Sequence, residues 1–203
     1  MTKRLITLGM AAIVCVAITA TVVRSQEKPA PAQDTADAAA AAQREQEMMK
    51  NAQPGEAHKR LARLAGEWTY TSTMNVPGQE PQRSEGTAKM MMTLDGRFLH
   101  EQNTGQMMGM PVTGTRVTGY NNGAKRYEAV WTWTMSTGML NLSGTSPDDG
   151  KTIHLAGDYD EADGPHRMTV TMKIESDDHL VFELGSPEAP GGAVMVLDYR
   201  RKK

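Results

Sequence analysis

The stretch that decides the fold reads Arg167-Met168-Thr169-Val170-Thr171-Met172-Lys173-Ile174. Its apolar and polar side chains alternate with a period of two, which is typical of a β-strand with one buried face and one exposed face. The same alternation recurs around Trp68, Met90, Trp131, Phe182 and Leu197. Turn signals rich in Gly, Asn and Asp separate these runs, so we predict about ten short strands between residues 66 and 201.

Connections this short join antiparallel neighbours, and a long meander with one apolar face buries that face best by closing on itself. One helix precedes the strands. Ala57, Leu61, Leu64 and Ala65 share a helical face, and Gly66 is a natural helix end. We therefore predict an all-β fold, an up-and-down antiparallel β-barrel with one short N-terminal helix that caps one end.

The first 25 residues have the pattern of a secretory signal peptide. Lys3 and Arg4 precede an uncharged, mostly apolar run from Leu5 to Val23, and small residues follow it. Cleavage near Gln26 is the expectation, with an uncleaved anchor as the alternative, since the run is just long enough to span a bilayer. We expect residues 26–55, rich in Ala, Pro and Gln, to form a disordered linker, and residues 56–203 to form the barrel.

Composition excludes some classes of partner. The chain has 22 basic and 24 acidic residues, a formal net charge of −2, and no basic field for nucleic acid. No polybasic stripe is present, so we expect no stable membrane association after signal cleavage. The single cysteine, Cys15, lies within the signal segment, and the mature chain would carry no disulfide in a secreted or periplasmic location.

The folded part carries several motifs in a fixed order, namely His58-x-x-Leu61-x-x-Leu64-x-Gly66-x-Trp68, Ser84-Glu85-Gly86-Thr87, Gly96-Arg97-Phe98-Leu99, Met107-Met108-Gly109-Met110-Pro111, Thr118-Gly119-Tyr120-Asn121, Tyr127 and Trp131. From about Pro54 to Arg201, these motifs resemble the bacterial family called domain of unknown function 1579. The resemblance implies a calycin-like, lipocalin-type β-barrel and carries over no catalytic residues. Trp133 and Arg116 depart from the family's pattern, which favours smaller side chains there.

Signatures of catalysis and of metal binding are missing. The sequence has no nucleophile elbow, no phosphate-binding glycine loop and no C-x-x-C pair. Its five histidines form no i, i+2 or i, i+4 pair, so we predict no metal site and no cofactor. A haem barrel would need an inward histidine, for which His100 and His154 are the mid-strand candidates.

The most aromatic strip of the chain is the predicted pocket wall, formed by Tyr127, Trp131, Trp133 and Met135. Side chains two apart on a strand share one face. Methionines are common in apolar pockets that accept varied ligands, and they could also bind copper, the alternative that we favour less. The remaining pocket candidates are Arg116, Tyr120, Met108 and Met110.

Arg116 shares a face with Tyr120, and a buried guanidinium needs an anionic partner. The sequence leaves two partners open, Glu101 on the neighbouring strand and the carboxylate of a bound acyl chain. Arg201 is a second, weaker candidate for binding such a carboxylate.

These observations predict a secreted or periplasmic barrel that binds a small apolar or amphipathic ligand and is not an enzyme. The alternatives are a haem- or metal-binding barrel and an envelope interaction module with a filled core. We also predict that Trp68 seals the barrel end against the helix.

Overall fold

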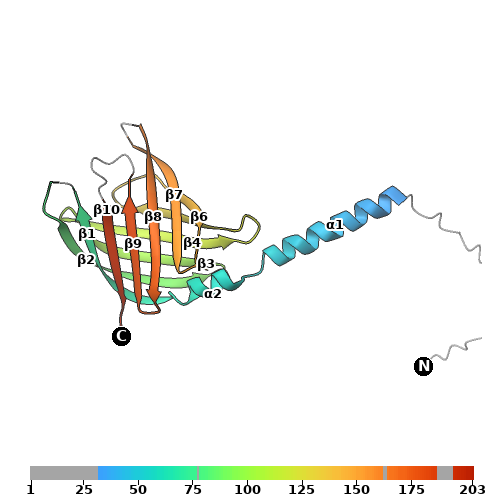
Figure 1. The fold of residues 1–203 in the computed structure, drawn as a ribbon, viewed down its shortest axis with the longest axis horizontal. Coiled ribbons are helices and arrows are strands. Elements are labelled where there is room, and N and C mark those ends of the chain that lie inside the picture. Colours follow the sequence, from blue (N-terminus) through green and yellow to red (C-terminus); the bar gives the residue numbers. More distant parts are fainter. Residues whose placement is uncertain (1–31, 77, 162–163, 187–193) are drawn as a thin grey trace, which may run out of the picture. The chain divides into compact units, whose positions relative to one another are not determined.

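The computed structural model describes residues 32–76, 78–161, 164–186 and 194–203 (Figure 1). The predicted signal peptide, residues 1–25, lies outside the described residues. The chain divides into two compact units, residues 1–41 and 42–203, and every strand belongs to the second unit. Within the described part of the chain, no helix combines the length and the apolar character needed to cross a membrane.

Helix α1, Ala32–Asn51, occupies most of the segment for which a disordered linker was predicted. The run from Ala38 to Ala42 explains the difference, since alanine has the highest helix propensity of all residues. From residue 36 onward, every side chain of α1 is exposed except that of Ala40, which is half-buried. The helix therefore buries no apolar face.

Helix α2, Glu56–Ala62, is the predicted capping helix. Ten strands follow it, and their bounds are β1 Gly66–Asn75, β2 Gln82–Thr93, β3 Phe98–Met107, β4 Met110–Asn121, β5 Arg126–Trp133, β6 Leu140–Thr145, β7 Thr152–Glu161, β8 Gly164–Ser176, β9 His179–Gly185 and β10 Val194–Arg201.

The ten strands form a closed barrel in which each strand pairs antiparallel with its neighbours in the sequence. The last strand returns to the first, with Trp68 of β1 opposite Arg201 of β10 and Met74 opposite Met195. The predicted up-and-down barrel is therefore confirmed. Closure leaves no sheet edge to pair with another chain.

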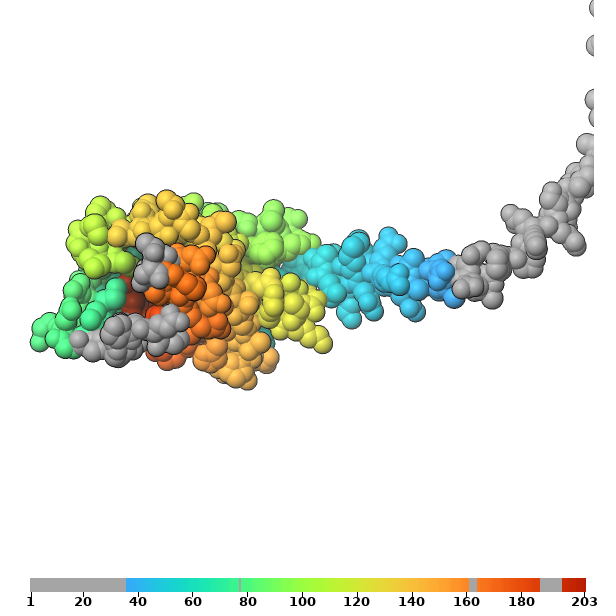
Figure 2. Space-filling model, turned by 90° about the horizontal axis from the view of Figure 1, so that it is seen from above, coloured from blue at the N-terminus to red at the C-terminus, as the bar shows by residue number. Residues whose placement is uncertain are grey.

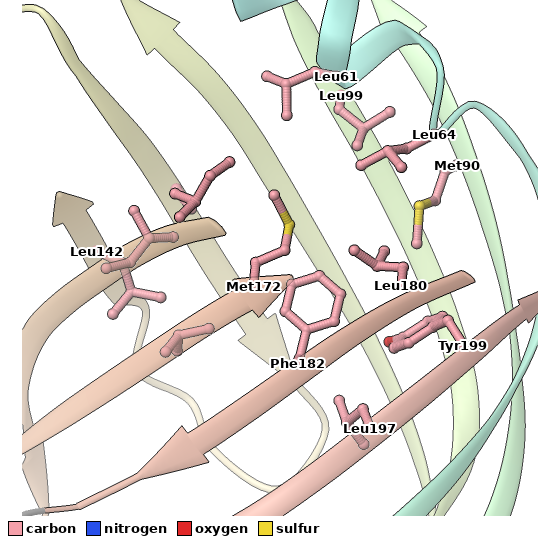
Figure 3. Packing of buried hydrophobic residues seen from close by; sticks show 14 of the residues in the cluster. Leu61, Leu64, Met90, Leu99, Leu142, Met172, Leu180, Phe182, Leu197 and Tyr199 are labelled. Atoms are coloured by element: carbon pink, nitrogen blue, oxygen red, sulfur yellow. The ribbon is translucent and has the colours of Figure 1, made fainter. Parts of the chain in front are cut away.

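The apolar core fills the end of the barrel that α2 covers. Leu61 and Leu64 at α2 are fully buried, and Figure 3 shows them beside Leu99 of β3 and Met90 of β2. Trp68 is also fully buried, and its Nε1 donates to the carbonyl oxygen of Leu64 at 3.0 Å. The prediction that Trp68 seals this end against the helix is confirmed.

Candidate functional site

The barrel has two different ends, which we call the closed end and the open end. The closed end carries α2 and the β2–β3, β4–β5, β6–β7 and β8–β9 connections. The open end carries the other five connections, beginning with β1–β2. Because neighbouring strands are antiparallel, odd-numbered strands begin at the closed end and end at the open end. Even-numbered strands run the opposite way.

A cavity of about 850 Å³ occupies the open end. Residues from every strand except β2, and from the β5–β6 connection, line it, and most of them are apolar. Figure 2 looks onto the molecule from above and shows a hollow with the dark red atoms of the C-terminal strand inside it. The barrel interior is therefore not filled throughout. The alternative of a module with a filled core required that it be filled.

One wall of the cavity consists of two indole rings from β5. Trp131 and Trp133 both line the cavity, and their ring centroids lie 5.7 Å apart with a tilt of 60° between the planes. Both side chains are half-buried. The Nε1 of Trp131 is buried and has no hydrogen-bond partner among the described residues.

Methionines surround the rest of the opening, and those that line the cavity are Met74, Met107, Met135, Met168 and Met195. Met135 thus lies at the cavity, as its place in the aromatic strip predicted. Met108 and Met110 lie in or beside the β3–β4 turn, are 69% and 46% exposed, and do not line the cavity. Period-two alternation breaks down in a turn, which is why the sequence misplaces these two.

The floor of the cavity is formed by Tyr70, Tyr199 and Asn103. The two tyrosine rings pack together with centroids 4.9 Å apart. Gly86 and Gly105 make room for Tyr70, because a Cβ atom at either position would lie within 2.4 Å of its ring or hydroxyl. Burial raises the pKa of Tyr70, and the nearby negative charge of Glu101 raises it further.

Below this floor lies a buried ion pair between Arg116 and Glu101, which are 6% and 2% exposed. The hydroxyl of Tyr199 donates to Glu101 Oε1 at 2.9 Å, and Asn103 Nδ2 donates to the same oxygen at 3.2 Å. The guanidinium carbon of Arg116 also lies 3.8 Å from the centroid of the Phe182 ring. Burial raises the pKa of Tyr199 well above its ordinary value, so this hydroxyl remains a donor.

Of the two partners that the sequence left open for Arg116, the structure provides Glu101. Arg116 does not line the cavity, and Tyr199 and Asn103, which do, bind the same carboxylate. A ligand in the cavity would meet the tyrosine and amide groups before it met the guanidinium.

Tyr120 and Tyr127 face inward as predicted, but at the closed end. Their rings meet edge to face with centroids 4.9 Å apart, and His58 of α2 packs edge-on against Tyr120. Tyr127 is 3% exposed and belongs to the core. The predicted strip is therefore divided, with Trp131, Trp133 and Met135 at the cavity and the tyrosines beneath α2.

Arg201 has a structural position as well. Its Nη1 and Nη2 donate to the carbonyl oxygens of Ala65 and Arg63, and its guanidinium carbon lies 4.4 Å from the Trp68 ring centroid. These carbonyls follow α2, so Arg201 fixes the helix to the barrel at the closed end. Arg201 does not line the cavity, and its guanidinium is engaged at the closed end.

The two histidines considered as haem ligands do not face the interior. His100 lies between the buried Leu99 and Glu101, and His154 between the buried Ile153 and Leu155, so both point outward. His154 is exposed and bonds Thr171. In the part of the chain that the structure describes, no three His, Cys, Asp or Glu side chains are grouped to hold a metal ion.

Comparison with solved structures supports the barrel assignment. An S-type phycobiliprotein lyase from Guillardia theta matches 73% of this chain and 96% of its own, with a TM-score of 0.52 and 11% identity. Rv2717c from M. tuberculosis matches 74% of this chain and 100% of its own, with a TM-score of 0.52 and 16% identity. At such identities the likeness shows the fold alone. Comparison with curated proteins gave no match.

A family model described as "protein of unknown function (DUF1579)" matches residues 53–201. The match covers α2 and all ten strands, including the cavity and the ion pair beneath it. The resemblance expected from the sequence motifs is confirmed, and the chain belongs to the DUF1579 family.

Proposed function

We propose that the barrel binds one small apolar or amphipathic molecule in the cavity at its open end. The observation that carries this proposal is the cavity itself, about 850 Å³ in volume and lined mostly by apolar and aromatic side chains, among them two indole rings and five methionines. Binding sites for small molecules are typically about 300–1,000 Å³, apolar, and furnished with a few polar groups. Asn103, Gln106 and Tyr199 supply polar groups here.

Binding without chemical conversion is part of the proposal. Glu101 is the buried carboxylate nearest the floor, and an arginine, a tyrosine and an asparagine already bind it. A general base needs a free position on the acceptor for the proton that it removes. The phycobiliprotein lyase shares the fold at 11% identity, which supports a barrel that holds a ligand and says nothing about the reaction.

We further propose that the protein acts outside the cytoplasm, in the periplasm or beyond it. The support is the sequence of residues 1–25, with Lys3 and Arg4 before an apolar run. Sequencing the N-terminus of protein recovered from cells is expected to find a start near Gln26. A chain that still begins at Met1 would contradict this.

The binding proposal is tested with N-phenyl-1-naphthylamine, a neutral apolar dye whose fluorescence increases in apolar binding sites. The wild-type barrel is expected to bind it, and Val112→Trp to weaken binding at least about tenfold, because Val112 lines the cavity. Val117→Trp is the matched control, since Val117 lies on the outer face of the same strand and is 38% exposed. No dye binding, or equal binding by both variants, would overturn the proposal.

A further inference from the structure

We propose that the cavity selects amphiphiles whose head group is cationic, such as a quaternary ammonium. This inference rests on the proposed function and adds the charge of the ligand to it. It is carried by three observations, namely the charges around the opening, the two indole rings of the wall, and the pairing of Arg116 with Glu101 below the floor.

Among the described residues, the charged side chains of the cavity lining and of the open-end connections are acidic. Among the described residues that line the cavity, Asp160 is the one charged side chain. The described residues of the five open-end connections add one more, Glu80, and no lysine or arginine. A carboxylate ligand would therefore approach two negative charges, whereas a cation would be attracted by both.

The indole wall suits a cation. Ring faces carry partial negative charge, and a cation within about 6 Å of a ring centroid is attracted, most strongly by Trp. Because Trp131 and Trp133 have centroids 5.7 Å apart and tilted planes, one head group can contact both rings. Elsewhere the chain supplies its own cation to a ring, Arg201 to Trp68 and Arg116 to Phe182. In the described structure, no lysine or arginine lies over Trp131 or Trp133.

The ion pair below the floor offers nothing to an anion. Arg116 is paired with Glu101 and packed against Phe182, so its charge is compensated before any ligand arrives. Releasing it for a ligand carboxylate would leave Glu101 buried without a cation, which is strongly unfavourable. The expectation of a fatty acid held by Arg116 is thereby replaced.

The test compares three probes with the same dodecyl chain, dodecyltrimethylammonium, dodecanol and dodecanoate, each below its micelle concentration. Displacement of N-phenyl-1-naphthylamine reports binding. Measurements are made at a single pH, pH 8, for all three probes. We expect the ammonium to bind at least about tenfold more tightly than the carboxylate, with the alcohol between them.

Two variants locate the selectivity. Trp133→Leu keeps an apolar wall and is expected to weaken ammonium binding about fivefold while dodecanol binding changes less than about twofold. Asp160→Asn is expected to reduce the preference of ammonium over carboxylate. Asp158→Asn is its matched control, because Asp158 pairs with Arg167 on the outer face and does not line the cavity.

The outcomes separate the two proposals. Equal binding of the three probes, or tighter binding of dodecanoate, overturns the cation preference and leaves the binding proposal intact. A selectivity that Trp133→Leu leaves unchanged also overturns it. If neither the dye nor any of the probes binds, the proposed function itself fails.

Discussion

The same strands build two unlike regions of one barrel, and β1 shows the difference within ten residues. At the closed end its Trp68 is fully buried, hydrogen-bonded to Leu64 and stacked on Arg201. At the open end its Met74 is half-buried at a cavity of about 850 Å³. Tight packing therefore lies under α2, and the other end is left unfilled. A barrel arranged in this way can change its lining without losing its fold.

Charge follows the same division. Among the described residues, the closed-end connections carry aspartates, lysines and Arg97. Arg97 and, from β10, Arg201 bond the segments around α2. Arg97 donates to the carbonyl oxygen of Ala52 at 3.0 Å, and Asn122 donates to those of Asn51 and Gln53. Polar bonds thus fix the chain before α2 to the closed end, whereas the open end presents thioethers and indoles.

The largest expected effect tests whether stability belongs to the closed end. Trp68→Ala is expected to lower the free energy of unfolding by about 3–5 kcal/mol, because it removes a fully buried ring. Trp133→Ala, at the open end, is expected to cost less than half as much. Urea denaturation of both variants measures the difference, and equal losses would show that the two ends share the stability.

The second prediction concerns the ion pair between the regions. Arg116→Met is expected to cost about 3 kcal/mol, because it leaves Glu101 buried without a cation. The double variant Glu101→Gln and Arg116→Met removes that charge and keeps an acceptor for Tyr199, so it is expected to regain much of the loss. Denaturation of the single and double variants checks this. A double variant no more stable than Arg116→Met would contradict it.

The third prediction concerns the bond between β10 and α2. Arg201→Ala is expected to cost about 1.5–3 kcal/mol, the usual worth of hydrogen bonds from a charged group. Arg200→Ala serves as control, because its pair with Asp198 is exposed and surface pairs contribute about 0–1 kcal/mol. If the two variants unfold at the same urea concentration, Arg201 does not fasten the helix.

The smallest effect is a dependence of stability on pH. Burial lowers the pKa of His58, whose Nδ1 accepts a hydrogen bond from the Gly55 N–H at 3.0 Å. The unfolded chain then binds more protons than the folded one just below pH 6.5, so stability falls as the pH drops through that range. His58→Gln is expected to flatten this dependence in thermal unfolding curves. His100→Gln, on the outer face, is expected to leave it unchanged.

The sequence predicts which face of a strand a residue occupies better than it predicts how far along the barrel the residue lies. Alternation around Trp131 correctly placed Tyr127 and Trp133 on the inner face. Whether a residue lies at the closed end or at the open end depends on strand register and on the position of α2. Alternation encodes neither of these. Tyr127 was therefore assigned to the pocket, although it packs in the core below the helix.

The partner of Arg116 shows a second limit. The sequence could place Glu101 on the strand next to Arg116, and Glu101 and Arg116 are indeed opposite each other in the register. Choosing between Glu101 and a ligand required the depth of the cavity floor. That floor depends on Tyr70, whose ring lies over Gly86 of β2 and Gly105 of β3. No local sequence pattern predicts such a contact between strands.

The pairing of β1 with β10 has a consequence for how this chain folds. Arg201 bonds the carbonyl oxygen of Ala65, 136 positions earlier, so the barrel cannot close until β10 has been synthesised. Loop closure over such a separation is paid in entropy before any contact offsets it, and proteins dominated by distant pairings fold slowly. A chain that stops before β10 would keep two unpaired sheet edges, the kind of surface that aggregates. The eight residues of β10 thus determine when the open sheet edges are paired and can no longer bind strands of other chains.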